Sequence, residues 1–278
     1  MGNNGGQTDW HDTNHALWDE RVAIHAISAS YNIEGFLKGD NVLMDFEPGE
    51  IGDLHGKRLV HLQCHMGQET LTWLRLGAQR VAGLDFSEAA IGKARELATA
   101  LGIGPEQAAF VVADVYDAPN ALPESEYDVV YVSMGSINWL PDIDRWAKTV
   151  AGLLAPGGFL YLNEFHPVTH VLDEATGTRF VRDYVTDRAM VREAAGTYTD
   201  ADRSAPTEHN TATEWVHSLG DVMSALAAAG LHLEFLHEWD KTVFHQFSSF
   251  ERGEDGWWGP QAGQPRVPLV YSLRASRP

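Results

Sequence analysis

The order of segments from Arg58 onward predicts an α/β fold with a mostly parallel sheet and helices on both faces. Short apolar segments typical of strands alternate there with segments of helical periodicity. The chain has 278 residues, of which 44% are hydrophobic, so it can bury one substantial core. Two late strands have no helix between them and must pair antiparallel if they are adjacent, which predicts a mixed edge for the sheet.

The first half of the chain contains the repeating pattern. Residues 1–50 are polar and aromatic, with a helical stretch from Trp18 to Ser30, and we expect them to form an N-terminal helical lid. Ser87 is placed to cap the helix that follows the second strand. Further helices are expected at 68–75 and 142–154. The strands expected in this part are Arg58–Gln63, Arg80–Asp85, Ala109–Ala113, Asp128–Val132 and Phe159–Phe165.

The pattern stops at His166, and residues of about 167–213 show little periodicity. A long irregular segment in a compact protein is usually a functional cap, so we expect a cap insertion here. Ser218 then precedes an apolar helix over 219–229, and strands follow at 232–239 and 267–273, with a loop at 255–260 between them. We therefore expect a lid at 1–50 and one domain at 51–278 that carries the cap.

Composition excludes several classes of protein. The net charge of −19, with no basic run, argues against nucleic-acid binding. No apolar run is long enough to cross a membrane, and the first residues lack the pattern of a signal peptide. The single cysteine, Cys64, excludes an intramolecular disulfide. We expect a cytoplasmic protein with a small-molecule partner, no nucleic acid and no membrane, as a monomer or homodimer.

The turn after the first strand predicts a nucleoside site. A dinucleotide fingerprint would place three glycines there, whereas this turn has only Gly67, so a pyrophosphate fits poorly. Asp85 ends the second strand, where its carboxylate can accept both ribose hydroxyls. Asp114 follows the third strand and can accept from an adenine amine. Apolar Phe86 and Val115 follow these two aspartates and complete the outline of the pocket.

A family resemblance rests on three segments, 61–71, 83–87 and 113–116, which read HLQCHMGQETL, GLDFS and ADVY. Supporting segments are 18–21, 139–142, 164–167 and 255–258, which read WDER, WLPD, EFHP and DGWW. Together they resemble a bacterial branch of class I S-adenosylmethionine-dependent methyltransferases whose first motif is Leu-Gln-Cys-His-x-Gly. The resemblance implies a Rossmann-like class I methyltransferase fold, with a mostly parallel seven-stranded sheet and one antiparallel edge strand.

The resemblance also implies roles for individual residues. It places Asp85 at the ribose and Asp114 near adenine of S-adenosylmethionine, whose product is S-adenosylhomocysteine. His61 stands where the family usually has an acidic residue that helps fix the amino group, and Glu69 is a candidate substitute. The complete set of cofactor-binding residues expected is Tyr31, Gln63, Cys64, His65, Gly67, Asp85, Phe86, Asp114, Val115, Ser133 and Met134.

Residues after the fourth and fifth strands and in the cap are candidates for the acceptor site. We expect Asn138, Trp139, Trp215 and His217 to bind the substrate. His166 follows the carboxyl end of a strand and is the candidate general base. Glu164 is expected to bind a cationic amine or to form a dyad with His166. No metal site is expected.

The function predicted is methyl transfer to a nitrogen, oxygen or carbon of a small molecule, with secondary metabolism as one setting. Three alternatives stay open. The first is a cyclase or another non-methylating enzyme that uses S-adenosylmethionine on the same fold, and the second is a protein that only binds the cofactor. The third is an NAD-dependent dehydrogenase, which the missing glycines disfavour.

Overall fold

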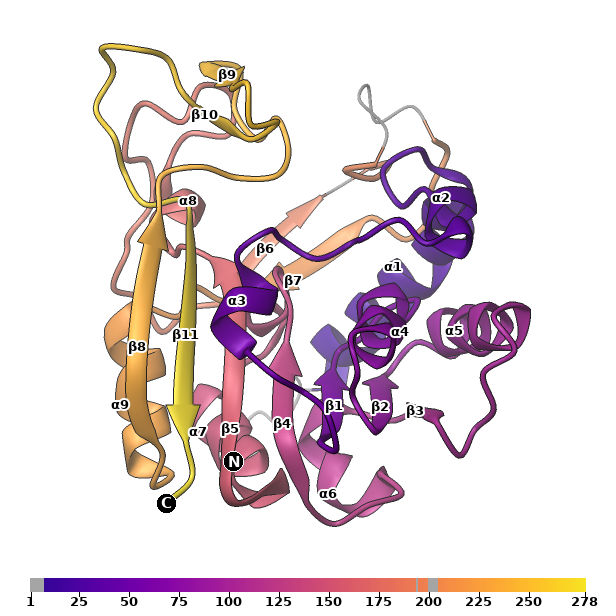
Figure 1. Cartoon of the computed structure of the whole chain (residues 1–278). Helices are drawn as coiled ribbons and strands as arrows, with labels where there is room; N and C mark the ends of the chain where they lie inside the picture. The colour runs from indigo at the N-terminus through magenta and orange to yellow at the C-terminus, as the bar shows by residue number, and fades with distance from the viewer. Residues whose placement is uncertain (1–7, 194, 200–204) are drawn as a thin grey trace, which may run out of the picture.

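The computed structural model describes residues 8–193, 195–199 and 205–278. Its main sheet has seven strands in the order β3-β2-β1-β4-β5-β11-β8 (Figure 1). They are β1 (Arg58–Leu62), β2 (Arg80–Asp85), β3 (Ala108–Val112), β4 (Tyr127–Val132), β5 (Leu154–Phe165), β8 (His232–Trp239) and β11 (Val270–Ser276). β11 runs antiparallel to both β5 and β8, whereas β1 to β5 pair in parallel. The predicted fold class is confirmed, with the antiparallel strand one position in from the edge.

Helices cover both faces of this sheet because the side chains of its strands alternate. Val60 points into a core with α7 (Ile143–Leu153) and α9 (Leu219–Ala228). Its neighbour Leu59 points into a second core with α4 (Gln68–Arg75) and α5 (Glu88–Ala100). Shorter helical segments are η1 (Val115–Asp117), α6 (Ala118–Ala121), η2 (Ile137–Trp139) and α8 (Val168–Val171). Strand order reverses between β1 and β4, which is where open α/β sheets bind ligands.

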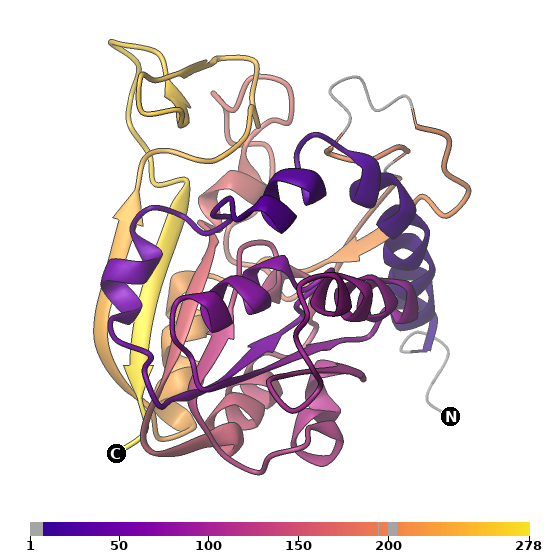
Figure 2. The ribbon, with the colours of Figure 1, turned by 45° about the vertical axis from the view of Figure 1, so that its right-hand side comes forward.

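The N-terminal segment forms α1 (Thr8–Ile27), α2 (Ile33–Lys38) and α3 (Glu47–Ile51). Figure 2 shows α1 beside α5. Asp19 of α1 accepts hydrogen bonds from the Ser87 hydroxyl (2.7 Å) and the Ala89 amide (3.1 Å), at the start of α5. The helix expected from Trp18 therefore begins ten residues earlier, at Thr8, and residues 1–7 of the expected lid lie outside the described residues. In its first turns, His11 and Asn14 have partners in distant segments, at Asp114 and Thr213.

Two small antiparallel strand pairs lie beyond the carboxyl ends of the parallel strands (Figure 1). β6 (Met190–Glu193) pairs with β7 (Thr211–Glu214), inside the segment expected to be irregular. β9 (Phe250–Arg252) pairs with β10 (Trp258–Pro260), which corrects the expected loop at 255–260. Strands of three or four residues are too short for an alternating pattern to identify them. Among the described residues, no helix is long and apolar enough to cross a membrane.

Candidate functional site

The turn after β1 has an unusual backbone. Gln63, His65 and Gly67 adopt left-handed conformations, with φ of 57°, 47° and 72°. This conformation is normal for glycine and costs other residues free energy, so such residues often mark functional sites. At Gly67 the reason for glycine is packing, because a β-carbon there would lie 2.6 Å from the Phe110 ring. The turn thus has the alternating left-handed shape of a glycine-rich loop while carrying two large side chains.

Those two side chains connect the turn to neighbouring segments. The Gln63 amide donates to the Ser136 carbonyl (2.9 Å), and its own oxygen Oε1 is buried without a partner among the described residues. His65 Nε2 lies 2.9 Å from His25 Nδ1 of α1, and His25 Nε2 lies 2.6 Å from the hydroxyl of Thr197. Burial lowers the pKa of His65 to about 4 and that of His25 to about 3, so both imidazoles are neutral at neutral pH. Cys64, between them, is buried, and burial raises the pKa of its thiol, which agrees with a packing role.

Asp85 joins the end of β2 to this turn. Its carboxylate is 6% exposed and accepts from the amides of His65 (2.8 Å) and Ser87 (2.9 Å). Burial raises the pKa of Asp85 to about 6, although these amides act in the opposite direction. Each oxygen keeps lone-pair capacity for a further donor. The next residue, Phe86, lies edge to face with His11 and with His15 of α1.

Asp114 lies at the end of β3, on the same side of the sheet. One carboxylate oxygen accepts from the Tyr116 amide (2.7 Å), and the other lies 3.1 Å from His11 Nε2. Val115 and Tyr116 are buried behind it. The residues expected to bind a nucleoside are thus brought together, with α1 lying over them.

A polar cluster follows the ends of β1 and β4. His61 contacts the hydroxyls of Thr70 (2.9 Å) and Ser133 (3.0 Å), and its Nε2 lies 3.7 Å from a carboxylate oxygen of Glu69. Burial lowers the pKa of His61 to about 3, so the ring is neutral. Burial also raises the pKa of Glu69 to about 7. Glu69 therefore brings an acidic group next to His61, beside the loop that contains Ser133 and Met134.

Glu164 and His166, the residues expected to be catalytic, have separate partners. The Glu164 carboxylate accepts from the amides of Gly135 (2.5 Å), Ser136 (2.8 Å), Ile137 (3.0 Å) and Phe165 (2.7 Å). His166 Nε2 lies 3.0 Å from a carboxylate oxygen of Glu238, and its Nδ1 accepts from the Val168 amide (3.1 Å). The structure therefore does not join the two in a dyad. Glu164 shapes the loop after β4, because three of the four backbone amides from which it accepts belong to that loop.

Three of the residues expected to bind the substrate line one cavity together with Glu164. They are Asn138, Trp215 and His217, whose Nε2 donates to the Leu140 carbonyl (2.7 Å). The remaining lining residues are Ile137, Phe165, Pro167, His170, Val216 and Tyr271. Trp139 does not line this cavity and instead packs edge to face against Trp18 of α1, with ring centroids 5.2 Å apart.

The sequence did not indicate two residues of this region, Tyr271 and Tyr198. Tyr271 belongs to β11, whose pairing with β5 places it opposite Glu164. Tyr31 was expected at the cofactor, and its hydroxyl contacts that of Tyr198, which was not foreseen. Such contacts join residues more than a hundred positions apart, and no local pattern encodes them. Within the described residues, no group of three His, Cys, Asp or Glu side chains is arranged to hold a metal.

Comparison with known proteins places the fold. Residues 60–158 match a family model described as a methyltransferase domain. A crystal structure of an S-adenosylmethionine-dependent methyltransferase from Mesorhizobium loti is similar with a TM-score of 0.58 and 21% identity, over 87% of this chain and 100% of that one. One from Clostridium acetobutylicum has a TM-score of 0.56 and 12% identity, over 96% and 98%. The structure of the [4+2]-cyclase SpnF has a TM-score of 0.51 and 17% identity, over 81% and 75%.

The matched segment spans the strands and turns that bring Asp85, Asp114 and the left-handed turn together. The sheet order and its antiparallel strand agree with the fold of the matched structures. Residues 60–158 therefore resemble a methyltransferase domain, and the chain has the fold of class I S-adenosylmethionine-dependent methyltransferases.

Proposed function

We propose that the protein transfers a methyl group from S-adenosylmethionine to a nitrogen, oxygen or carbon of a small-molecule acceptor. The observation that carries this proposal is the buried Asp85 carboxylate, fixed at the end of β2 by the amide of the left-handed turn. A carboxylate in that position accepts two ribose hydroxyls, and the turn has side chains where a pyrophosphate would need bare backbone.

The residues present fit this cofactor at three points. Asp85 would accept from the ribose, and Asp114 would accept from the adenine amine in place of His11. The unpartnered Oε1 of Gln63 is an open acceptor, and Glu69 is an acidic group nearby, so both suit the ammonium of the methionine part. When bound, the cofactor supplies a methyl group already activated by a positively charged sulfur.

The chain's own residues would position the acceptor and keep water out. Glu164 fixes the loop over 133–137 by accepting from its amides, and this loop would border the methyl group. α1 and the cap cover the site, since Asn14 exchanges two hydrogen bonds with Thr213 of β7. His166 is the proposed base for acceptors that must lose a proton. Burial lowers its pKa, so the imidazole is neutral at neutral pH, and its Nδ1 would take the proton once it releases the Val168 amide.

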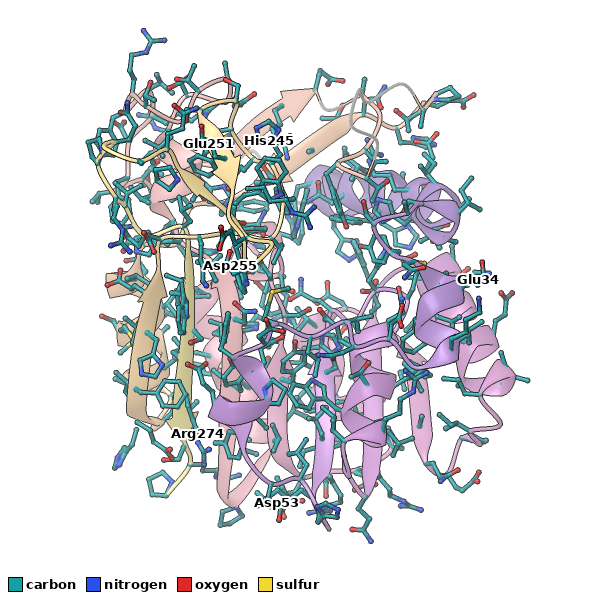
Figure 3. All side chains as sticks on the ribbon, turned by 45° about the horizontal axis from the view of Figure 1, so that its top comes forward. Glu34, Asp53, His245, Glu251, Asp255 and Arg274 are labelled. Carbon is teal, nitrogen blue, oxygen red and sulfur yellow. The ribbon has the colours of Figure 1, made fainter. Side chains whose placement is uncertain are left out.

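Calorimetric titration with S-adenosylhomocysteine tests the cofactor half of the proposal. We expect Asp85→Asn to weaken binding by at least about 10-fold, because a hydrogen bond to a charged group contributes about 1.5–3 kcal/mol. Asp53→Asn is the matched control. Figure 3 shows Asp53 at the far end of the molecule from His245 and Glu251, and its side chain is 77% exposed. Equal affinity in the Asp85 variant and the control would refute the assigned ribose contact.

Product analysis tests the reaction. A cyclase is the second candidate, because a structure of similar fold is described as a [4+2]-cyclase. Incubation with S-adenosylmethionine and a pool of small metabolites should yield S-adenosylhomocysteine together with a methylated product. Release of methylthioadenosine, or a rearranged product with the cofactor intact, would favour non-methylating chemistry. Stabilisation by NAD but not by S-adenosylhomocysteine would favour a dehydrogenase.

A further inference from the structure

The cavity beneath the cap contains two buried polar atoms that have no partner among the described residues. Asn138 is 9% exposed, and its Oδ1 accepts no hydrogen bond. Tyr271 is 1% exposed, and its hydroxyl is likewise unpaired. Both residues line the same cavity. Buried polar groups in folded proteins nearly always have hydrogen-bond partners, so we expect a bound molecule to supply partners for these two atoms.

The orientation of the Asn138 amide follows from its neighbours. Its Nδ2 lies 3.4 Å from Oε1 of Glu214, which can only accept while ionised. Glu214 in turn accepts from Arg192 at 2.8 and 2.9 Å. Turning the amide over would place its oxygen against the carboxylate. The amide nitrogen therefore faces Glu214, and the amide oxygen Oδ1 can accept a hydrogen bond from a bound molecule.

The charges around the cavity are already matched. Arg192 is engaged by Glu214, and the Glu164 carboxylate accepts from four backbone amides. Burial lowers the pKa of both His170 and His217, so these rings are neutral at neutral pH. Among the described residues, an anion would meet no unpaired cation here, and the one carboxylate that lines the cavity, Glu164, already accepts four hydrogen bonds. A buried charge without a partner is strongly disfavoured, so the cavity suits a neutral group.

We propose that this cavity anchors the neutral hydroxyl or N–H end of an aromatic acceptor, which donates to Asn138 and pairs with the Tyr271 hydroxyl. Trp215 and Phe165 also line the cavity and offer apolar surface to the ring behind that group. The enclosed cavity has a volume of about 10 Å³, which is room for one group the size of a hydroxyl, so the donor end enters it and the ring lies at its opening. This inference rests on the proposed methyltransferase function and names the class of its acceptor.

The cavity lies beside the loop that is expected to border the site of transfer. Ile137 and Asn138 line it, and they follow the loop whose Ser136 carbonyl accepts from Gln63 of the first turn. One end of the acceptor in the cavity would therefore lie one loop away from the methionine part of the cofactor. The hydroxyl or N–H group in the cavity is the part of the acceptor that is recognised. The atom that receives the methyl group would lie nearer the turn after β1.

Four matched ring compounds test the proposal by calorimetry, on protein with and without S-adenosylhomocysteine. They are 4-methylphenol, 4-methylanisole, benzoate and benzylammonium. We expect 4-methylphenol to bind at least about 10-fold more tightly than 4-methylanisole, which lacks the donor and carries an extra methyl. Benzoate and benzylammonium should bind more weakly than 4-methylphenol by a similar or larger factor, because each would bury a charge.

Two variants and a control locate the effect. Tyr271→Phe and Asn138→Ala should each weaken 4-methylphenol by at least about 5-fold and leave 4-methylanisole nearly unchanged. Tyr127→Phe is the control, because its hydroxyl is also buried but lies at the start of β4, at the other end of the sheet. Thermal unfolding of each variant shows whether it is folded at the temperature of the titration.

The outcomes separate the two proposals. Equal affinity for 4-methylphenol in Tyr271→Phe, Asn138→Ala and the control would overturn the anchoring role, as would preferred binding of benzoate or benzylammonium. Those results would leave the cofactor proposal standing if S-adenosylhomocysteine binds and methyl transfer is observed. Failure of S-adenosylhomocysteine to bind would refute the proposed function, while the titrations without cofactor would still decide whether the cavity selects a neutral donor.

Discussion

At the scale of single residues, the first turn combines backbone strain with side-chain contacts. Gln63 and His65 have positive φ angles, and a residue with a β-carbon is about 1–2 kcal/mol less stable than glycine in that conformation. Their side chains offset this cost by joining the turn to Ser136 and to His25. A glycine-rich loop avoids the strain but makes none of these contacts.

Replacing Gln63 separates the two effects. Gln63→Ala keeps the strained β-carbon and loses the hydrogen bond, whereas Gln63→Gly loses the bond and removes the strain. We expect the glycine variant to be more stable than the alanine variant by about 1 kcal/mol, measured by chemical unfolding. Both variants should bind S-adenosylhomocysteine about 10-fold more weakly, because the open Oε1 acceptor is gone. Equal stability of the two variants would contradict strain at this position.

The buried histidines predict a pH dependence of known sign. The pKa of His25 falls from its usual 6.5 to about 3, so below pH 6.5 the unfolded chain binds a proton that the folded chain does not. Its contribution to stability is complete above pH 6.5 and is lost as the pH falls toward about 3. The limiting slope is about 1.4 kcal/mol per pH unit.

The carboxyl groups of the site act in the opposite direction. The pKa of Asp85 is raised to about 6 and that of Glu69 to about 7, so the stability they contribute is complete at acid pH and is lost as the pH rises through those values. The difference in stability between the wild type and a His25 variant isolates the contribution of this histidine. We expect the stability advantage of the wild type over His25→Asn to shrink as the pH is lowered from 7 to 5, in chemical unfolding experiments. Parallel stability curves would contradict a neutral, buried His25.

At the scale of elements, Glu164 connects the end of β5 to the loop after β4. It accepts from three amides of that loop, and a glutamine can accept them with only one of its two terminal atoms. We expect Glu164→Gln to lower the free energy of unfolding by about 2 kcal/mol or more, because buried amides lose their partner. Glu238→Gln, at the 45% exposed partner of His166, should change it by less than about 1 kcal/mol. A Glu164 variant as stable as wild type would instead indicate a carboxylate kept free for substrate.

The repeating strands and helices could be predicted because each has a local cause. Their apolar runs must be buried, and Ser87 caps its helix as expected. Ser218 and Asp142 cap the helices that were expected to begin next to them, each accepting from a backbone amide. The start of α1 could not be predicted in this way. Its buried polar residues, such as Asn14 and Arg21, have partners about 190 residues away. Their burial depends on the cap, which has no strong pattern of its own.

The candidate site likewise has one part that the sequence predicts and one part that it does not. The residues proposed to bind the cofactor follow strand ends, and strand ends can be predicted from the sequence, so Asp85 and Asp114 were expected on the same edge of the sheet. The proposed dyad failed because it was inferred from proximity along one strand. Glu164 and His166 are both in or next to β5. However, Glu164 accepts from amides of the loop after β4, whereas His166 contacts Glu238 of β8.

At the scale of the whole molecule, α1 and the cap form one cover over the site. Asn14 and Thr213 exchange two hydrogen bonds, and the Glu20 carboxylate accepts from the amides of Glu208 and His209. His25 links the cover to the first turn through His65. A cofactor held by Asp114 must also replace the contact from His11 of α1. We therefore expect cofactor binding and the position of the cover to be coupled.

Hydrogen exchange with mass spectrometry tests this coupling. We expect S-adenosylhomocysteine to slow exchange in α1 and in residues 211–214 together, because the Asn14 contacts make them move as a unit. β9 and β10 have their own small cluster with Phe247 and Leu269, so exchange there should change little and provides an internal control. In Asn14→Ala, protection by the ligand should persist in α5, next to Asp85, but weaken in residues 211–214. Undiminished protection of both segments in that variant would show that they close over the cofactor independently.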